Sequence, residues 1–174
     1  MKRREFTALA AASLLPLAHA QADKTLRVMV GFPPGGSIDI VARVLADKMK
    51  DELKANIVVE NRAGAGGRLV ADLLKSAPAD GSVVMITPVV VPVLAPLVFS
   101  KLNYNPGTDF APVGHVCNFN FALSIPASLP AKTVAEFVAW LKANPQRANF
   151  GSPAAGSLPH FFGEILSREA RADM

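Results

Sequence analysis

One stretch near the start of the chain constrains the fold more than any other. Residues 26–30 suit a buried strand, residues 31–36 contain a glycine-rich turn, and a helical pattern begins at Ser37. Glycines let a backbone approach a ligand closely, and the Ser37 hydroxyl is expected to cap the first free amides of the helix. Those amides and the positive end of the helix dipole favour a negative group at this turn.

The same layout of strand, turn and helix follows a second time. Residues 57–60 suit a strand, residues 63–67 a glycine turn, and a helix is expected from Arg68 that ends before Pro78. A third apolar run at residues 83–86 completes a β-α-β-α-β pattern, which predicts parallel strands with right-handed crossovers. Ligands of such sheets lie at the carboxyl ends of the strands, where both turns fall. The sequence therefore predicts a site for something acidic at this edge.

The middle of the chain is less regular. Prolines interrupt residues 88–112, which predicts a short helix or a loop. Residues 113–117 and 119–125 are predicted to be strands of a second unit. Cys117 lies within this apolar run and is expected to be a small core residue.

The last part of the chain returns to clear signals. Thr133 and Glu136 form a predicted capping box at the start of a helix. Residues 149–152 suit a short strand. Residues 156–160 are expected to open a further helix, the third whose first turn is favourable to an anion.

The first residues carry an export signal. Three basic residues at positions 2–4 precede an Ala/Leu-rich run that ends in a small-x-small site at residues 18–20. This pattern predicts a secretory signal peptide over residues 1–20, with cleavage after Ala20 or Ala22. The paired arginines also fit a twin-arginine motif, so both export routes stay open.

Charge and composition exclude several function classes. Loss of the signal removes three cationic residues and one anionic residue, so the formal net charge falls from +4 to +2. No long basic run and no interleaving of aromatic with basic residues remains, which argues against binding to nucleic acid. The single cysteine cannot form an internal disulfide. Neither a His pair at helical spacing nor a cysteine cluster is present, so we expect no metal and no cofactor.

Two alternatives remain beside a binding protein. Pairing of Ser152 or Ser157 with His160 would suit a secreted hydrolase, although no Gly-x-Ser-x-Gly elbow occurs. Residues 64–67 resemble part of the loop of a nucleotide-binding α/β domain, although the full Gly-x-Gly-x-x-Gly spacing is missing. We expect a binding protein and not an enzyme.

Several motifs occur along the chain in a fixed order. They are V-G-F-P-P-G-G-S-I-D at 30–39, V-E-N-R-A-G-A-G-G at 59–67, A-D-G at 79–81, Y-N-P with D-F-A-P-V between 104 and 113, L-P-A-K-T at 129–133, and G-S, G-S and H between 151 and 160. The ordered set resembles the Bug family of extracytoplasmic solute receptors, the TctC-like substrate-binding subunits of tripartite tricarboxylate transporters.

The resemblance implies a fold and a function. The fold would be α/β and periplasmic-binding-protein-like (type II), with two lobes built from parallel-sheet β/α units around a cleft. Residues 23–112 would form the N-terminal part of the first lobe, and residues 113–174 the second lobe, incomplete in this chain. The mature protein would lie in the periplasm, bind a small carboxylate such as a di- or tricarboxylate, and deliver it to the membrane subunits of the transporter. The complete receptor would be a monomer.

The resemblance also implies which residues bind the ligand. The first turn would hold a carboxylate largely through backbone amides, and the second lobe would supply the other side of the cleft. The implied ligand-binding residues are Phe32, Pro34, Gly35, Gly36, Ser37 and Asp39 in the first lobe and Ser152, Gly156, Ser157 and His160 in the second. From the residues alone, Asp39 is expected to support the helix dipole more than to touch an acidic ligand.

The chain departs from the family pattern in two ways. Residues 87–91 are bulky and apolar where the family places a small, glycine- and serine-rich loop. The family is also roughly twice as long as this chain, so we expect a truncated member that binds ligands poorly by itself.

Overall fold

The protein contains a small parallel sheet at its N-terminal end. The computed structural model describes residues 25–174, so the predicted signal peptide lies outside the described residues. Strands β1 (Thr25–Val30), β2 (Asn56–Asn61) and β3 (Val83–Ile86) form a parallel sheet in the order β2-β1-β3. The predicted β-α-β-α-β pattern is confirmed, and both glycine turns follow the carboxyl ends of their strands.

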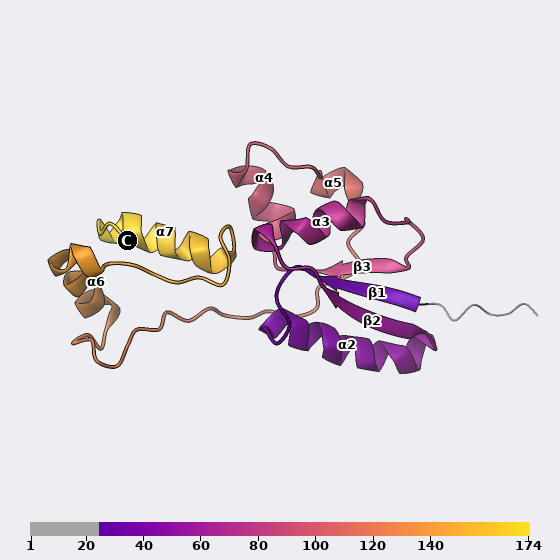
Figure 1. The fold of residues 1–174 in the computed structure, drawn as a ribbon, viewed down its shortest axis with the longest axis horizontal. Coiled ribbons are helices and arrows are strands. Elements are labelled where there is room, and N and C mark those ends of the chain that lie inside the picture. Colours follow the sequence, from indigo (N-terminus) through magenta and orange to yellow (C-terminus); the bar gives the residue numbers. More distant parts are fainter. Residues whose placement is uncertain (1–24) are drawn as a thin grey trace, which may run out of the picture.

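A helix covers each face of the sheet (Figure 1). Helix α2 (Ser37–Leu53) packs its buried alanines against Val28 and Val30 of β1. Helix α3 (Arg68–Lys75) lies on the other face, where Met29 is buried with Val70. Successive side chains of a strand point to opposite faces, which is why neighbouring residues of β1 serve the two layers.

The chain after β3 forms short helical pieces on the α3 side of the sheet. They are η2 (Val90–Leu94), a single π-helical stretch, followed by α4 (Ala95–Val98) and α5 (Pro106–Asp109). The buried Tyr104 hydroxyl donates a hydrogen bond to the carbonyl oxygen of Val91 at 2.9 Å, which ties the end of this region to η2. The prediction of short helices or loops here is confirmed.

The strands predicted at residues 113–117 and 119–125 are wrong. This segment runs as an irregular, extended connection with most of its residues exposed (Figure 1). A strand needs a neighbour for its backbone groups, and among the described residues no other strand lies beside this one. Cys117 is accordingly exposed, so its expected place in a core is also wrong.

Two helices form the C-terminal part. Helix α6 (Val134–Ala143) begins at the predicted capping box of Thr133 and Glu136, and both hydrogen bonds of that box are present. A turn of 3-10 helix, η3 (Pro145–Arg147), leads to residues 149–152, which are irregular, so the strand predicted there is wrong.

Helix α7 (Leu158–Ala170) joins the two parts of the molecule. Its C-terminal end packs on α6 around the buried side chains of Phe137 and Leu141. Its N-terminal end packs Leu158 and Phe161 against the cluster of α3 and η2. Helix α7 therefore points its first turn at the carboxyl edge of the sheet (Figure 1). Among the described residues, no helix has the length and apolar character needed to cross a membrane.

Candidate functional site

The turn after β1 leaves backbone amides free at the start of α2. Gly36 is the N-cap residue and Ser37 the first helical residue, and no side chain caps the helix. The expectation that Ser37 caps α2 is therefore wrong, because its hydroxyl lies one position too late. The first helical hydrogen bond runs from the Ile40 amide to the Gly36 carbonyl at 3.0 Å. The amides of residues 37–39 precede it and have no partner within the helix.

Asp39 holds this turn in shape. Its carboxylate accepts hydrogen bonds from the Gly35 amide at 2.8 Å, Arg43 Nε at 3.0 Å and Asn61 Nδ2 at 2.9 Å. Asn61 also donates to the Phe32 carbonyl at 3.1 Å, so β2 is tied to the same turn. These donors, Arg43 first, hold the pKa of the buried Asp39 carboxyl well below its usual value. Asp39 is thus a charged structural support of the turn.

The second glycine turn contacts both the turn after β1 and the segment before α7. It contains η1 (Ala65–Gly67) and leads into α3. A Cβ on Gly31 would stand 2.7 Å from the Cα of Gly67, so the two turns touch directly. Arg68 then places its guanidinium 3.5 Å from the ring centroid of Phe99. These contacts give the second glycine turn a structural role.

The first turn of α7 contains a buried hydroxyl. Ser157 is the N-cap residue, yet its side chain caps no amide. The residue is 1% exposed, and its Oγ has no hydrogen-bond partner among the described residues. His160 Nδ1 accepts a hydrogen bond from the Gly156 amide at 3.3 Å, and Ser152 Oγ donates to the Ala154 carbonyl at 3.4 Å. No hydrogen bond of the described residues joins His160 to either serine, so the pairing that a hydrolase needs is not assembled.

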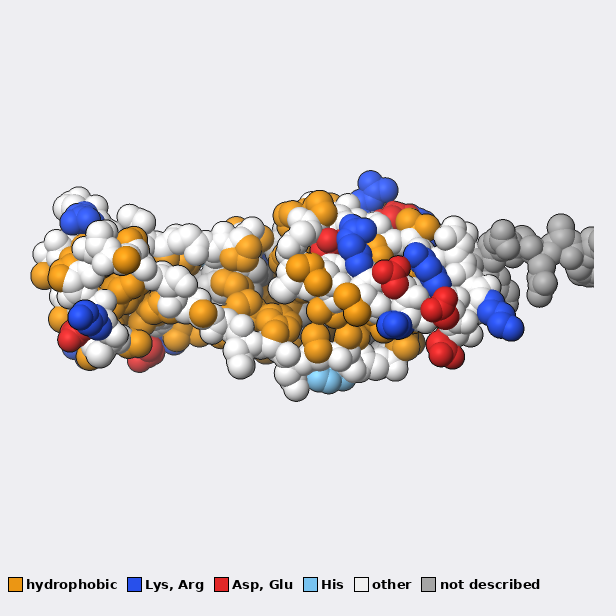
Figure 2. All heavy atoms as spheres, turned by 90° about the horizontal axis from the view of Figure 1, so that it is seen from below, with side chains coloured by type: hydrophobic (Ala, Val, Ile, Leu, Met, Phe, Trp, Pro, Cys, Tyr) orange, Lys and Arg blue, Asp and Glu red, His pale blue; other side chains and the backbone are white. Residues whose placement is uncertain are grey.

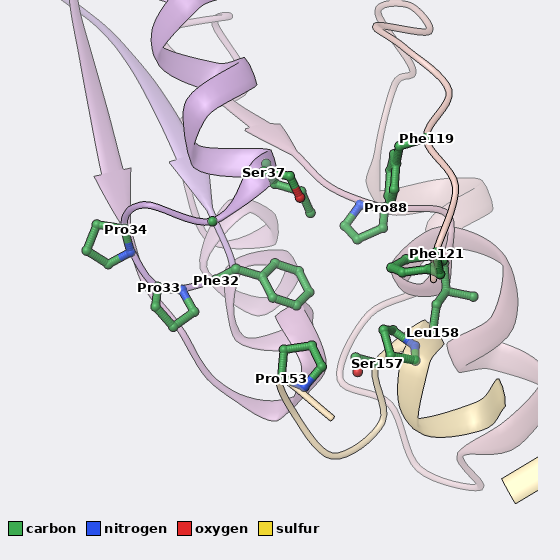
Figure 3. A pocket seen from close by; sticks show the side chains of 13 residues that line it. Phe32, Pro33, Pro34, Ser37, Pro88, Phe119, Phe121, Pro153, Ser157 and Leu158 are labelled. Carbon is green, nitrogen blue, oxygen red and sulfur yellow. The ribbon is translucent and has the colours of Figure 1, made fainter. Parts of the chain in front are cut away.

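The two helix N-termini meet at one cavity of about 260 Å³ (Figure 3). Five of the ten implied ligand-binding residues line it, namely Phe32, Pro34, Gly36, Ser37 and Ser157. The other five do not line it, namely Gly35, Asp39, Ser152, Gly156 and His160.

Eight further residues line the cavity that the sequence did not indicate, namely Pro33, Ile38, Pro88, Phe119, Phe121, Pro153, Leu158 and Pro159. Five of these eight residues are sequence neighbours of predicted site residues, and only Pro88, Phe119 and Phe121 are not. Pro88 follows the carboxyl end of β3, so the rule that placed the other turns at this edge would also have found it. Phe119 and Phe121 come from the extended connection, and no sequence signal placed that connection against the sheet.

The cavity suits an anionic group attached to an apolar body. None of the described residues that line it is charged, and most are phenylalanine, proline or aliphatic. Its polar features are the free amides of α2, the first turn of α7 and the hydroxyls of Ser37 and Ser157. Helix N-termini with free amides attract anions. No group of His, Cys, Asp or Glu in the described part of the chain could hold a metal ion.

Comparison with known proteins gives consistent matches. The family model described as tripartite tricarboxylate transporter family receptor matches residues 41–174. The UPF0065 protein of the gbd 5′ region in Cupriavidus necator is 37% identical over 96% of this chain and 54% of its own length. Protein BugT of Bordetella pertussis is 33% identical over 82% of this chain and 44% of its own length. The chain spans about half the length of the curated relatives it matches.

Solved structures agree with these matches. A structure titled as a periplasmic transporter is 35% identical, with a TM-score of 0.75 over 89% of this chain and 52% of that one. A Rhodopseudomonas palustris protein solved with adipate is 28% identical, with a TM-score of 0.78 over 86% of this chain and 50% of that one. MatC from the same organism was solved with bound malate and is 28% identical. Its TM-score is 0.74 over 86% of this chain and 51% of that one. The described residues therefore form a parallel-sheet α/β part of a periplasmic-binding-protein fold.

Proposed function

Because this chain belongs to the receptor family of tripartite tricarboxylate transporters, we propose that it is a periplasmic receptor for a small carboxylate. The observation that carries the proposal is the meeting of two helix N-termini at one uncharged cavity. Each helix end is equivalent to roughly half a positive charge, so the two together match about one carboxylate. The amides at the start of α2 would donate hydrogen bonds to its oxygens.

The surrounding residues support the same role. Asp39 accepts the hydrogen bond of the Gly35 amide and so fixes the turn. The amides of residues 37–39 would then face the ligand. Among the described residues no cation lines the cavity, so the carboxylate would be held by oriented amides and hydroxyls. Such preorganised dipoles bind charge without the rearrangement of a long side chain.

The solved neighbours support the chemical class of the ligand. One was solved with adipate and another with bound malate, both small carboxylates. We propose that this chain takes a ligand of that class and passes it to the membrane subunits of a tripartite tricarboxylate transporter. We also propose that the receptor is a monomer that reaches the periplasm through cleavage near Ala20 or Ala22.

A titration of the purified protein tests the proposal. A thermal-shift screen against small carboxylates would find the ligand, and calorimetry would then compare the protein with Gly36→Val and Ser37→Asp. Gly36 has φ −74°, and a Cβ there would meet no atom closer than 3.6 Å, so valine acts on the cavity and not on the backbone. Loss of one charge-assisted hydrogen bond costs about 1.5–3 kcal/mol, so we expect binding at least about tenfold weaker.

Two controls make the titration decisive. Gly114→Val changes a glycine with nothing within 4 Å and should leave affinity unchanged. A second protein carries, after Met174, the remaining part of the Cupriavidus necator relative, and we expect it to bind more tightly because a fuller cleft excludes more water. If no small carboxylate binds either protein, or if both cavity variants bind as tightly as the unchanged protein, the proposal is wrong.

A further inference from the structure

The wall of the cavity that faces the start of α2 is apolar. Pro88 is buried after β3, and the rings of Phe119 and Phe121 stand beside it (Figure 3). The Phe121 ring packs edge-on against Phe119, with centroids 5.1 Å apart, and against Phe162 of α7 at 5.6 Å. Three separate segments therefore meet in one wall, which we call the Pro88–Phe121 wall.

The side chains of this wall offer no partner for a polar group. Its side chains have no donor or acceptor, and no charged residue of the described chain lines the cavity. Hydrophobic side chains also gather on the surface midway along the molecule, between the charged end and the C-terminal helices (Figure 2). Both phenylalanines still expose more than two-fifths of their surface, so apolar area remains that a ligand could cover.

The polar groups of the cavity lie elsewhere, at its two helix starts. Ser37 and the free amides of α2 form one group. The buried Ser157 hydroxyl at the start of α7 forms the other and has no partner in the described protein. A buried hydroxyl without a partner is costly, and a ligand atom at this position would remove that cost. Polar groups thus suit the ends of a ligand, and apolar groups suit its body.

We propose that the cavity selects a carboxylate with an unsubstituted hydrocarbon body over hydroxylated acids and tricarboxylates of similar length. This rests on the proposed function, since it assumes that the cavity binds carboxylates at all. A hydroxyl on the body loses its water against the Pro88–Phe121 wall and finds no partner there. The two helix ends match about one charge, and no cation of the described chain lines the cavity, so each further carboxylate is uncompensated and a third adds to that cost.

Two ligand series separate these effects. Succinate, malate and tartrate have the same chain length and the same two carboxylates. Succinate carries no hydroxyl, malate carries one and tartrate carries two. Succinate, glutarate and adipate add methylenes alone. With the purified protein and its extended version in calorimetry, we expect affinity to fall about tenfold for each hydroxyl. We expect it to rise about fourfold for each methylene, and citrate to bind most weakly.

A matched pair of variants locates the effect at the wall. Pro88→Ser places a hydroxyl in the wall, so the preference for succinate over malate should shrink by several-fold. Pro112→Ser changes an exposed proline outside the cavity and should keep the preference. The Kd ratio of the two acids reports selectivity even where a variant is less stable. Malate or tartrate binding as tightly as succinate would overturn the inference and leave the proposed function standing, whereas no binding by any acid would overturn both.

Discussion

The backbones of Gly66 and Gly156 lie in direct contact. A Cβ on Gly66 would stand 2.8 Å from the carbonyl carbon and oxygen of Gly156, a separation that real Cβ atoms essentially never show. Gly66 lies in η1 at the edge of the sheet, and Gly156 immediately precedes Ser157 at the start of α7. The contact therefore joins the N-terminal sheet to the C-terminal helices and fixes the distance between the two helix starts at the cavity.

We expect Gly66→Ala to destabilise the protein by about 1–3 kcal/mol. Gly66 has φ 66°, where L side chains are strained, and the new methyl group would also push against the Gly156 backbone. Chemical denaturation followed by circular dichroism would measure the change in the free energy of unfolding. Gly81→Ala carries the same backbone strain at φ 81° without a neighbour within 4 Å, so the difference between the variants isolates the contact. Equal effects of the two would contradict the contact.

The lowered pKa of Asp39 predicts how the stability of the protein depends on pH. Its pKa is lower in the folded protein than the ordinary value of 3.8, mainly because Arg43, Gly35 and Asn61 donate to the carboxylate. The unfolded chain therefore binds the proton more readily, so this stabilisation is complete above about pH 5 and is lost as pH falls through and below 4. Asp39→Asn should remove that part of the acid-dependent loss.

Denaturation midpoints between pH 3 and pH 7 would check this. Asp47→Asn is the matched control on the same helix, because Asp47 is an exposed partner of Lys50. We expect the control to keep the steep loss of stability in acid that Asp39→Asn flattens. Identical pH profiles for the unchanged protein and Asp39→Asn would show that Asp39 does not carry this effect.

The extended connection predicts the reactivity of Cys117. The thiol is exposed in the folded protein, so a disulfide reagent such as Ellman's reagent should modify it without prior unfolding. We expect the rate in buffer to lie within a few-fold of the rate in denaturant. A thiol that reacts only after unfolding would mean that residues 113–125 pack into a core, as the sequence pattern had suggested.

Export can be tested at the N-terminus. We expect the mature protein in the periplasm of a competent host to begin at Gln21 or Asp23, which mass spectrometry of the intact protein would show. Changing Arg3 and Arg4 to lysine should block export only if the twin-arginine route is used. A full-length product that stays in the cytoplasm of such a host would contradict the signal peptide.

Local patterns predicted the parts of the fold that local chemistry determines. The apolar run of β1, its glycine turn and the stripe of α2 gave the strand, the turn and the helix correctly, and the Thr133 capping box gave the start of α6. Residues 113–125 show the opposite case. Their apolar residues suit a strand, but a strand also needs a partner, and sequence alone does not reveal whether one is present.

Some residues of the candidate site could likewise be predicted from local sequence, and others could not. Ser37 and Gly36 were predictable because a glycine turn before a helix has its own signal. Phe119 and Phe121 reach the cavity only because the extended connection returns to the sheet, which depends on tertiary packing with Phe162. Asp39 supports the turn before its helix, and its hydrogen bond from Asn61 could not be foreseen without the position of β2.

The central claim is that a carboxylate binds where the first turns of α2 and α7 meet. Two-dimensional NMR of the ¹⁵N-labelled protein, titrated with adipate, tests it most directly, because amides that donate to a carboxylate shift strongly. We predict the largest shifts at the amides of Ser37, Ile38 and Leu158, with the amides of α6 unchanged. Shifts concentrated on α6, or spread evenly over the surface, would contradict the claim.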